Sequence, residues 1–440
     1  MKSNYTEIKY FLILTTIFLL IRCSEEKICD RNIEIINKHD VEGYSNKISY
    51  SPGETIDFHI HSLTDTIDIE IIRYGRTNQS IYKGYNIPSI QQNYDCGADF
   101  YGCNWKITYQ YIIPENLLSG IYSAFLTNKN NEEFYISFVI KNNSYIKSDI
   151  VILANTNTWQ AYNAWEGNSF YKFKYGERIK AAEFLSFLRP NIADSPESNT
   201  GHLLNAELHL YRWIEEKNYA YDVIADIDLH NNQNVLNDYK MIILNAHPEY
   251  FTTEMYNHLL LFIKNGGNLI YLGGNAIFRK VILSDNQIER LQLTDYHNLA
   301  YGKGGEWDNL GRSQDSILGI KYSPSGYNTY FPYRVIDSNH WIFNDTNLKN
   351  GDTFGEESLN GGAASGHELD KIGEIYYSDS FIHLAKGMNP EESGADMVFF
   401  EMPNGGGKVF SVGSITFTGS LPVDENVSII VENVINKFLN

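Results

Sequence analysis

The segment Tyr239–Tyr250 (YKMIILNAHPEY) constrains the fold more than any other stretch of the chain. Its uninterrupted apolar run, Met241–Leu244, is typical of a strand buried on both faces. The run ends in a turn that carries an imidazole and a carboxylate, His247 and Glu249. Ligands of open α/β sheets bind at the carboxyl ends of the strands, so this turn is a candidate site. Alternatively, Glu249 caps a helix that begins near Thr253.

Strand-like and helix-like segments alternate on both sides of this turn. Short apolar runs at Asp149–Ala154, Tyr221–Ala225 and Asn268–Leu272 predict further strands, and Leu203–Glu216 and Glu254–Lys264 predict helices. This alternation predicts an α/β domain over residues 149–440, with a parallel sheet flanked by helices on both faces and long irregular loops at about 284–400. Polar strand ends should then share one rim of the sheet, which would collect 155–163, 226–230, 247–249 and Asn275.

The preceding region has a different pattern. Between residues 33 and 145, short alternating or β-branched runs are separated by turn residues, which predicts an all-β, Ig-like sandwich domain. His59 and His61 alternate with apolar residues in one of these runs. They indicate a solvated strand face more readily than a metal-binding pair.

The N-terminus resembles an export signal. Lys2 and Lys9 precede an apolar run, Tyr10–Ile21, which is too short for a membrane-spanning helix and suits a signal peptide over residues 1–22. Cys23 follows directly and resembles the lipidated cysteine of bacterial lipoproteins, although Arg22 stands where such signals prefer a small residue. We therefore expect an exported chain, periplasmic or at the cell surface, with a lipid anchor left open.

Cysteine usage agrees with export. All four cysteines lie in the first quarter of the chain, and Cys96 and Cys103 flank a short glycine-containing loop. A disulfide between these two fits an exported protein better than a metal site does. The net charge of -19 argues against nucleic acid or an anionic membrane surface as a partner, because both attract basic faces.

Several motifs together resemble the large (beta) subunit of N,N-dimethylformamidase and its wider family. The resemblance covers about residues 45–440, and the motifs occur in the same order as in that family. They are TNTWQAYNAWEGNSFY (156–171), FLRP (187–190), DIDLH (226–230), AHPEYFTTEM (246–255), GGNLIYLGGN (266–275), GGAASGHELD (361–370) and GGKVFSVGSITFTGSL (406–421).

This resemblance implies a mononuclear ferric site held by two tyrosines and one glutamate. The matching residues are Tyr162, Tyr171 and Glu249, although Phe173 and Tyr175 crowd the same loop as Tyr171. Phenolate and carboxylate are hard oxygen ligands, which suit a ferric ion better than zinc or copper. Without the resemblance, both tyrosines would more often be packing residues.

The resemblance also implies catalytic roles for three further residues. His247 would orient Glu249 or shuttle a proton, and Asn275 would hold the substrate carbonyl or the oxyanion. Glu368 would serve the departing amine as general acid or base. The DIDLH segment offers Asp226, Asp228 and His230 as another metal cluster, but capping of a neighbouring helix is the simpler role.

The expected sheet also resembles the class I glutamine amidotransferase fold. Those enzymes use a cysteine nucleophile at a strand-to-helix turn, and this chain has no cysteine after Cys103, so thiol-dependent amidotransfer is excluded. No GxSxG motif supports a serine hydrolase either.

The resulting hypothesis is a ferric-iron-dependent amidohydrolase that cleaves the C–N bond of a small amide. The alternative is an exported, non-catalytic surface protein that binds glycans and retains the fold. The characterised enzymes carry an additional N-terminal domain and a small partner subunit. This chain has room for only one sandwich before the sheet, so we do not expect that partner subunit. Assembly of identical chains is an open alternative.

Overall fold

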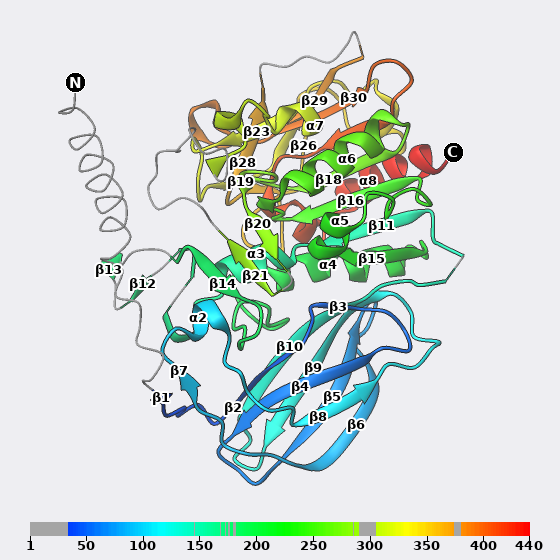
Figure 1. Cartoon of the computed structure of the whole chain (residues 1–440). Helices are drawn as coiled ribbons and strands as arrows, with labels where there is room; N and C mark the ends of the chain where they lie inside the picture. Colours follow the sequence, from blue (N-terminus) through cyan, green and yellow to red (C-terminus); the bar gives the residue numbers. More distant parts are fainter. Residues whose placement is uncertain are drawn as a thin grey trace, which may run out of the picture.

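The computed structural model describes residues 34–440, apart from 145, 168, 172, 175–176, 179–181, 285, 290–304 and 374–379. The expected signal peptide and Cys23 lie outside these residues. A β-sandwich forms the lower half of Figure 1, and a larger sheet with its helices forms the upper half. No helix within the described ranges is long and apolar enough to cross a membrane.

The lower half consists of two sheets that share one core. Alternation in Thr55–Ser62 turns Ile56, Phe58 and Ile60 inward, where each is fully buried. These side chains pack against apolar residues of the facing sheet. One sheet has the order β3 (Ser49–Tyr50), β10 (Glu133–Ile140), β9 (Gly120–Asn128), β5 (Thr66–Tyr74), β6 (Gln79–Pro88), and the other β2 (Val41–Ser45), β4 (Thr55–Ser62), β8 (Tyr109–Ile112).

The expected disulfide between Cys96 and Cys103 is wrong. Cys103 is a free, buried thiol, whereas Cys96 is disulfide-bonded and therefore has a different partner. Cys103 instead packs with Tyr44, Trp105 and Trp165. The loop spacing that suggested the pair is a weak guide, because side-chain direction decides which thiols can meet.

The upper half is built on a nine-stranded mixed sheet. Five adjacent strands are parallel, and the last four continue the sheet in antiparallel pairings. Their order is β15 (Tyr221–Ala225), β11 (Ile150–Ala154), β16 (Met241–Ala246), β18 (Asn268–Gly273), β31 (Lys408–Ser411), β30 (Asp396–Glu401), β29 (Ile382–Gly387), β25 (Tyr333–Val335), β26 (Thr353–Phe354).

The expected fold class, a parallel sheet flanked by helices as in class I glutamine amidotransferases, is therefore wrong. The protein is mostly β, with 35% strand and 21% helix, and its sheets are mixed. The turn Met402–Gly407 (MPNGGG) joins β30 to β31 as a hairpin, which forces antiparallel pairing. Strand–helix alternation carries no information about this hairpin, and the glycine-rich turn is the signal in the sequence that favours antiparallel pairing.

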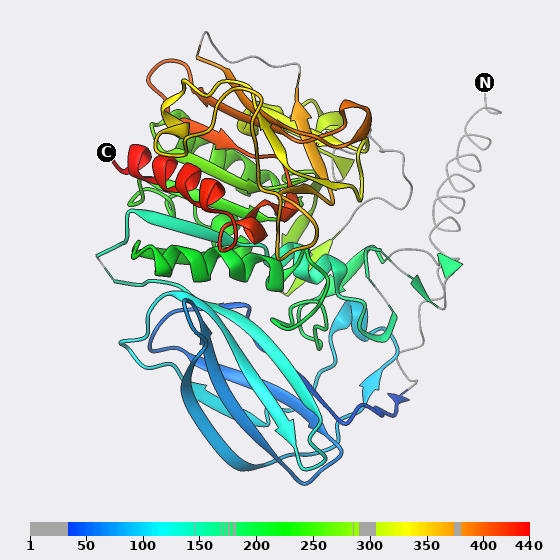
Figure 2. The ribbon, with the colours of Figure 1, turned by 180° about the vertical axis from the view of Figure 1, so that it is seen from behind.

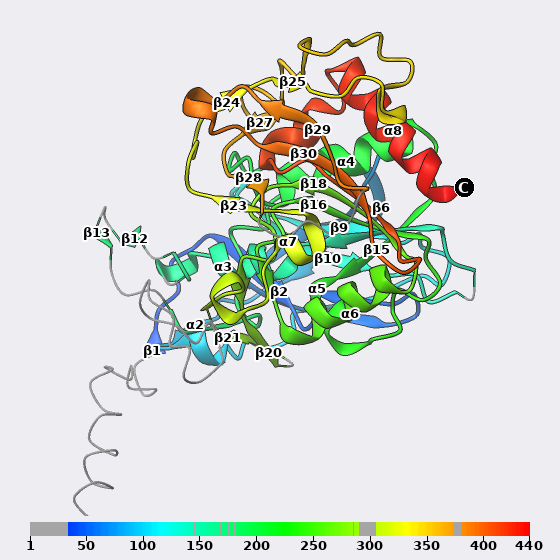
Figure 3. The same cartoon turned by 90° about the horizontal axis from the view of Figure 1, so that it is seen from above.

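Four helices pack on the large sheet. Figure 2 shows α4 and α8 on one face, and Figure 3 shows α5 and α6 on the other side of the strands. The helices are α2 (Ala98–Tyr101), α3 (Thr156–Tyr162), α4 (Leu204–Glu216), α5 (Asp226–Asn231), α6 (Thr253–Lys264), α7 (Asp315–Leu318) and α8 (Glu425–Leu439), with 3-10 turns η1 (Trp165–Gly167), η3 (Asp308–Leu310), η4 (Trp341–Phe343), η5 (Pro390–Glu392) and η6 (Ile415–Ser420).

The loops around the large sheet contain several short strands. They include β17 (Tyr250–Phe251), which pairs with β19 (Arg279–Lys280) beside the candidate turn. The others are β1 (Glu34–Ile35), β7 (Tyr94–Asp95), β12 (Phe173–Lys174), β13 (Glu177–Arg178), β14 (Phe184–Ser186), β20 (Ile282–Ser284), β21 (Gln287–Glu289), β22 (Gly305–Glu306), β23 (Ile320–Ser323), β24 (Tyr330–Phe331), β27 (Ser365–Gly366) and β28 (Leu369–Ile372).

Polar side chains link the sandwich to the sheet above it. Asp228, at the start of α5, accepts a hydrogen bond from Ser49 at 2.7 Å and pairs with Lys141 at 2.6 Å. Arg73 of β5 pairs with Glu215 of α4 at 2.8 Å. Because these contacts join strands of one half to helices of the other, they fix the sandwich against the part that carries the site.

Candidate active site

The turn after β16 is held by backbone hydrogen bonds from the segment that follows β18. Gly274 donates to the carbonyl of Ala246 at 3.0 Å, and Ile277 donates to that of Pro248 at 2.9 Å. The Glu249 amide donates to Thr158 Oγ1 at 3.2 Å. Both strands are parallel neighbours, so their carboxyl ends meet here.

Glu249 does not cap α6. Thr252 is the N-cap residue of that helix, and its side chain accepts a hydrogen bond from Met255. The carboxylate of Glu249 points instead to a group of tyrosines. The capping alternative is therefore wrong.

Three oxygen-bearing side chains converge at this point. The Tyr171 hydroxyl donates to Glu249 Oε1 at 2.5 Å, and the Tyr162 hydroxyl donates to Oε2 at 3.3 Å. The two phenol rings stack with centroids 4.4 Å apart. Tyr250 was not predicted from the sequence, although it directly follows Glu249 in the chain, and its hydroxyl donates to that of Tyr171 at 2.6 Å. We call Tyr162, Tyr171 and Glu249 the oxygen cluster.

Helix α3 carries Tyr162 to the cluster from the end of β11. Its residues 156–161 are all buried, and the Asn155 side chain provides no cap. Asp226 takes that role from a neighbouring segment, because its Oδ2 accepts a hydrogen bond from the backbone of Asn157 at 2.7 Å. The helix is therefore anchored at one end while Tyr162 stands at the other.

Burial shifts the titration of all three members of the cluster. It raises the pKa of Tyr162 and of Tyr171 well above the usual tyrosine range, and the nearby Glu249 carboxylate acts in the same direction. Burial also raises the pKa of Glu249 and outweighs the opposing effect of His247. In the protein alone, both phenols therefore keep their protons.

His247, Asn275 and Glu368 form a second group beside the cluster. His247 Nε2 lies 3.2 Å from Glu368 Oε2 and 3.4 Å from Glu249 Oε2, so the imidazole stands between the two carboxylates. Asn275 Nδ2 donates to Glu368 Oε2 at 2.7 Å. Asp370, which the sequence analysis missed, fixes Asn275 by accepting its backbone N–H at 2.9 Å.

The pKa values of this group follow from its contacts. Burial would raise the pKa of Glu368, but His247 outweighs it and lowers the value to about 2. Burial would lower the pKa of His247, and Glu368 reverses this, so the pKa is raised. Glu368 is therefore ionised, and the proton of the pair resides on His247.

Two further histidines, His202 and His367, stand beside this group and were also missed. The His202 ring lies 4.8 Å from the Tyr162 ring, 5.7 Å from that of His247 and 5.1 Å from that of His367, on which it stacks. Burial, with a contribution from His247, lowers the pKa of His202 to about 4. In the sequence, only the motif GGAASGHELD indicates this region, and it does so through Glu368. No local pattern marks His202 or His367 as functional.

Several buried polar atoms around this group have no hydrogen-bond partner among the described residues. Native proteins rarely leave such atoms unsatisfied, so their clustering indicates a polar occupant. They include His202 Nε2, His247 Nδ1, His367 Nδ1 and Asn275 Oδ1.

The DIDLH segment has structural contacts. Asp226 caps α3, Asp228 joins the two halves of the molecule, and His230 lies 2.9 Å from Thr252 Oγ1. The three side chains are not arranged around one point for a metal ion, and no set of three or more His, Cys, Asp or Glu residues is so arranged in the described part of the chain. The oxygen cluster, with its two tyrosines, is a different kind of donor set.

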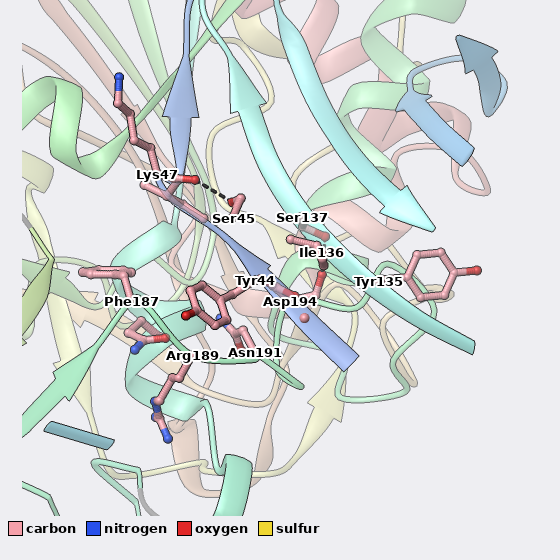
Figure 4. Close-up of a pocket in the computed structure, with 13 residues that line it drawn as sticks. Tyr44, Ser45, Lys47, Tyr135, Ile136, Ser137, Phe187, Arg189, Asn191 and Asp194 are labelled. Atoms are coloured by element: carbon pink, nitrogen blue, oxygen red, sulfur yellow. Dashed lines mark hydrogen bonds between the residues drawn. The ribbon is translucent and has the colours of Figure 1, made fainter. Parts of the chain in front are cut away.

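A small cavity lies behind α3, between the sandwich and the loop after β14 (Figure 4). Its volume is about 30 Å³, and Gln160, Arg189 and Asp194 contribute to its wall. Burial raises the pKa of Asp194 well above its usual range. The cavity holds none of the residues of the oxygen cluster, so it is separate from the candidate site.

A profile of the family described as N,N-dimethylformamidase beta subunit-like, C-terminal, matches residues 69–429. The chain belongs to this family. Its members in Alcaligenes sp. and Paracoccus aminophilus, each named N,N-dimethylformamidase beta subunit, are both 25% identical to it. Each alignment covers 78% of this chain and 55% of the relative, so the chain spans about half the length of the curated relatives it matches.

Solved structures are much less similar. A beta-galactosidase from Bacillus circulans sp. alkalophilus is 13% identical over 66% of this chain and 31% of its own, with a TM-score of 0.35. A ThuA-like protein from Parabacteroides merdae is 12% identical over 64% of this chain and 87% of its own, with a TM-score of 0.29. Membership of the dimethylformamidase beta subunit-like family therefore rests on sequence.

Proposed function

We propose that this protein is a metal-dependent hydrolase that cleaves the C–N bond of a small amide. The observation that carries the proposal is the oxygen cluster, in which Tyr162 and Tyr171 direct their hydroxyl groups to the two carboxylate oxygens of Glu249. The comparisons support the proposal through membership of the family and through the name that both relatives carry, N,N-dimethylformamidase beta subunit.

The donor set of the oxygen cluster fits a mononuclear ferric ion. Two phenolates and one carboxylate would be three hard anionic ligands, and their burial without a cation would be costly. The pKa values of Tyr162 and Tyr171 are raised in the protein alone, so a strong positive charge would be needed to remove the phenol protons. When bound, such an ion supplies Lewis acidity, which polarises an amide carbonyl and makes water more acidic.

The residues of this chain supply the proton chemistry. His247 holds a proton between Glu249 and Glu368, within reach of either carboxylate. We assign His247 the transfer of a proton to the departing amine nitrogen. Glu368, which is ionised, would accept the proton that the attacking water releases and pass it back to His247. The low pKa of Glu368 makes it unsuitable as the acid itself.

Asn275 orients this proton-transfer pair. One hydrogen of its side-chain amide is committed to Glu368, and its Oδ1 remains available on the same side chain. We therefore assign Asn275 to positioning Glu368 and to contact with the substrate, in place of a pure oxyanion role.

Export and assembly belong to the proposal as well. The apolar run Tyr10–Ile21 ahead of Cys23 supports export to the periplasm or cell surface, with a lipid anchor on Cys23. Both relatives are named as a beta subunit, so we include assembly into an oligomer. Cell fractionation with labelled palmitate and the solution mass by light scattering test these two points.

The decisive experiment is metal analysis together with the visible spectrum of the purified protein. Phenolate bound to ferric iron should colour the protein, and Glu249→Gln should lose both iron and colour while remaining folded. Glu254→Gln, on the outer face of α6, is the matched control and should retain both. A colourless, iron-free protein from iron-replete cells would contradict the ferric assignment.

An amide screen then separates a hydrolase from a binding protein. Released amine or ammonia from small formamides and acetamides should depend on the bound metal and disappear in Glu249→Gln. A coloured protein without turnover on any amide would favour the non-catalytic surface protein instead.

A further inference from the structure

The strongest unexplained feature of the site is the hydrogen-bonding state of His202. Its Nδ1 lies 2.7 Å from the backbone carbonyl oxygen of Thr200. A carbonyl oxygen can only accept, so Nδ1 carries the hydrogen and donates. In a neutral imidazole with its hydrogen on Nδ1, Nε2 carries the lone pair. Nε2 is therefore left with a free lone pair.

This lone pair has no partner among the described residues, although it is buried. His202 belongs to the wall of the candidate site, since its ring contacts the Tyr162 ring and lies beside that of His247. A fixed acceptor in this place is open to a donor on a bound molecule, and its pairing is favourable because buried acceptors are rarely left unsatisfied. Asn275 Oδ1 is a second buried acceptor without a partner in the described part of the chain.

We propose that His202 Nε2 receives a hydrogen bond from the N–H of the substrate amide, and that the protein therefore acts on primary or secondary amides in preference to N,N-dialkyl amides. This inference rests on the proposed amide hydrolysis and specifies its substrate class. An N,N-dialkyl amide carries no N–H and would leave the acceptor buried and unpaired. Sites built around such a hydrogen bond discriminate strongly against ligands that lack it.

The His202 ring is oriented independently of the substrate. The bond to Thr200 fixes the tautomer, and stacking on His367 at an interplanar angle of 18° fixes the plane. His367 itself adopts a left-handed backbone conformation with φ of 68°, which is uncommon for a residue other than glycine. Such preorganisation suits a residue that selects among ligands.

The test compares acetamide, N-methylacetamide and N,N-dimethylacetamide as substrates of the metal-loaded protein. We expect kcat/KM for the better of the two N–H amides to exceed that for the dimethyl compound by at least about tenfold. His202→Phe keeps the aromatic stacking but removes the acceptor, so it should reduce this ratio to about one. His209→Phe, which changes another histidine of low pKa on α4, is the matched control and should keep the wild-type ratio.

Equilibrium binding of the same three amides, measured by calorimetry, gives a readout that does not depend on turnover. The same preference in binding, and its loss in His202→Phe, supports the inference even if no amide is hydrolysed. In that case only the proposed hydrolysis fails. His202→Gln, which retains an acceptor oxygen, should keep part of the preference and covers the case in which the phenylalanine variant does not fold.

Two results would overturn the inference. The first is that the wild-type protein binds or hydrolyses the dimethyl amide with the same efficiency as the N–H amides, or binds none of the three amides. The other is an unchanged preference in folded His202→Phe. Hydrolysis of the dimethyl amide with no N–H preference would leave the proposed hydrolase intact and remove only the role of His202.

Discussion

Single hydroxyl groups define the candidate site. Tyr171 and Tyr250 differ in what their hydroxyls contact, since only that of Tyr171 reaches Glu249 directly. Tyr250 acts on Glu249 through Tyr171. This order gives the two tyrosines different expected roles, as ligand and as support of a ligand.

We therefore predict different effects for Tyr171→Phe and Tyr250→Phe. Tyr171→Phe leaves Tyr162 as the remaining phenolate ligand, so it should weaken and shift the visible absorption band and reduce kcat/KM by at least about a hundredfold. Tyr250→Phe keeps both phenolates, so it should leave the band unchanged and reduce kcat/KM by about tenfold. The spectrum per bound iron and the amine-release rate measure both. An unchanged band in Tyr171→Phe, with a weakened and shifted band in Tyr250→Phe, would move the ligand assignment to Tyr250.

A buried carboxyl group behind α3 predicts a dependence of stability on pH. Glu207 is fully buried and accepts a hydrogen bond from Trp159 Nε1 at 2.6 Å, and burial raises its pKa from 4.5 to about 8. The folded protein then binds more protons than the unfolded chain between these values, so the free energy of unfolding falls as pH rises from about 4.5 to 8.

Between about pH 4.5 and 8, the free energy of unfolding of Glu207→Gln should fall by less than that of the wild type, and the difference should be at least about 1 kcal/mol, because the amide cannot ionise. Denaturant unfolding at pH 5 and pH 8 measures the difference. Glu216→Gln, on the exposed end of the same helix, should follow the wild type. An equal pH dependence in the two variants would show that Glu207 does not carry the effect.

At the level of elements, α3 depends on a cap from outside the helix. The helix spans only residues 156–162, and helices this short are unstable alone. Asp226 supplies the missing acceptor to the backbone of Asn157, and burial raises its own pKa to about 8. At neutral pH it is therefore a protonated acid, which asparagine imitates closely.

Asp226→Ala should lower the free energy of unfolding by about 1 to 2 kcal/mol and weaken iron binding, because the end of α3 that carries Tyr162 loses its anchor. Asp226→Asn keeps an acceptor and should lose less than half as much. Chemical denaturation and iron titration of the two variants measure these effects. If both variants behave alike, the cap is not what positions Tyr162.

On the scale of the whole molecule, the sandwich and the mixed sheet are joined by a largely buried ion pair. The side chains of Arg73 and Glu215 are 6% and 19% exposed, and Arg73 also donates to the backbone carbonyl of Ser119 at 3.4 Å. Removing one partner of such a pair leaves the other without compensation. The two halves should therefore depend on each other for stability.

Arg73→Met should lower the free energy of unfolding by about 2 to 3 kcal/mol and separate the unfolding of the sandwich from that of the sheet. Lys83→Met breaks an exposed pair with Glu70 within the sandwich and should cost less than about 1 kcal/mol. Calorimetry of both variants measures the number of transitions and their midpoints. A single unshifted transition in Arg73→Met would contradict the coupling.

The sequence alone determined the strand Met241–Leu244 and the turn that follows it, because burial on both faces appears directly as a run of apolar residues. The motifs that resemble the dimethylformamidase family implied Tyr162, Tyr171, Glu249 and Asn275 as candidates. Of these, only Glu249 and Asn275 also follow from the local pattern, because each stands just after an apolar run.

Only the tertiary structure decided which distant segments meet. It brought His202 and His367 beside Tyr162, continued the sheet in antiparallel strands and left Cys103 as a free thiol. Apolar periodicity records whether a residue is buried but not which partner buries it. Contacts across many residues depend instead on strand order and loop paths, so they can be read only once the chain is folded.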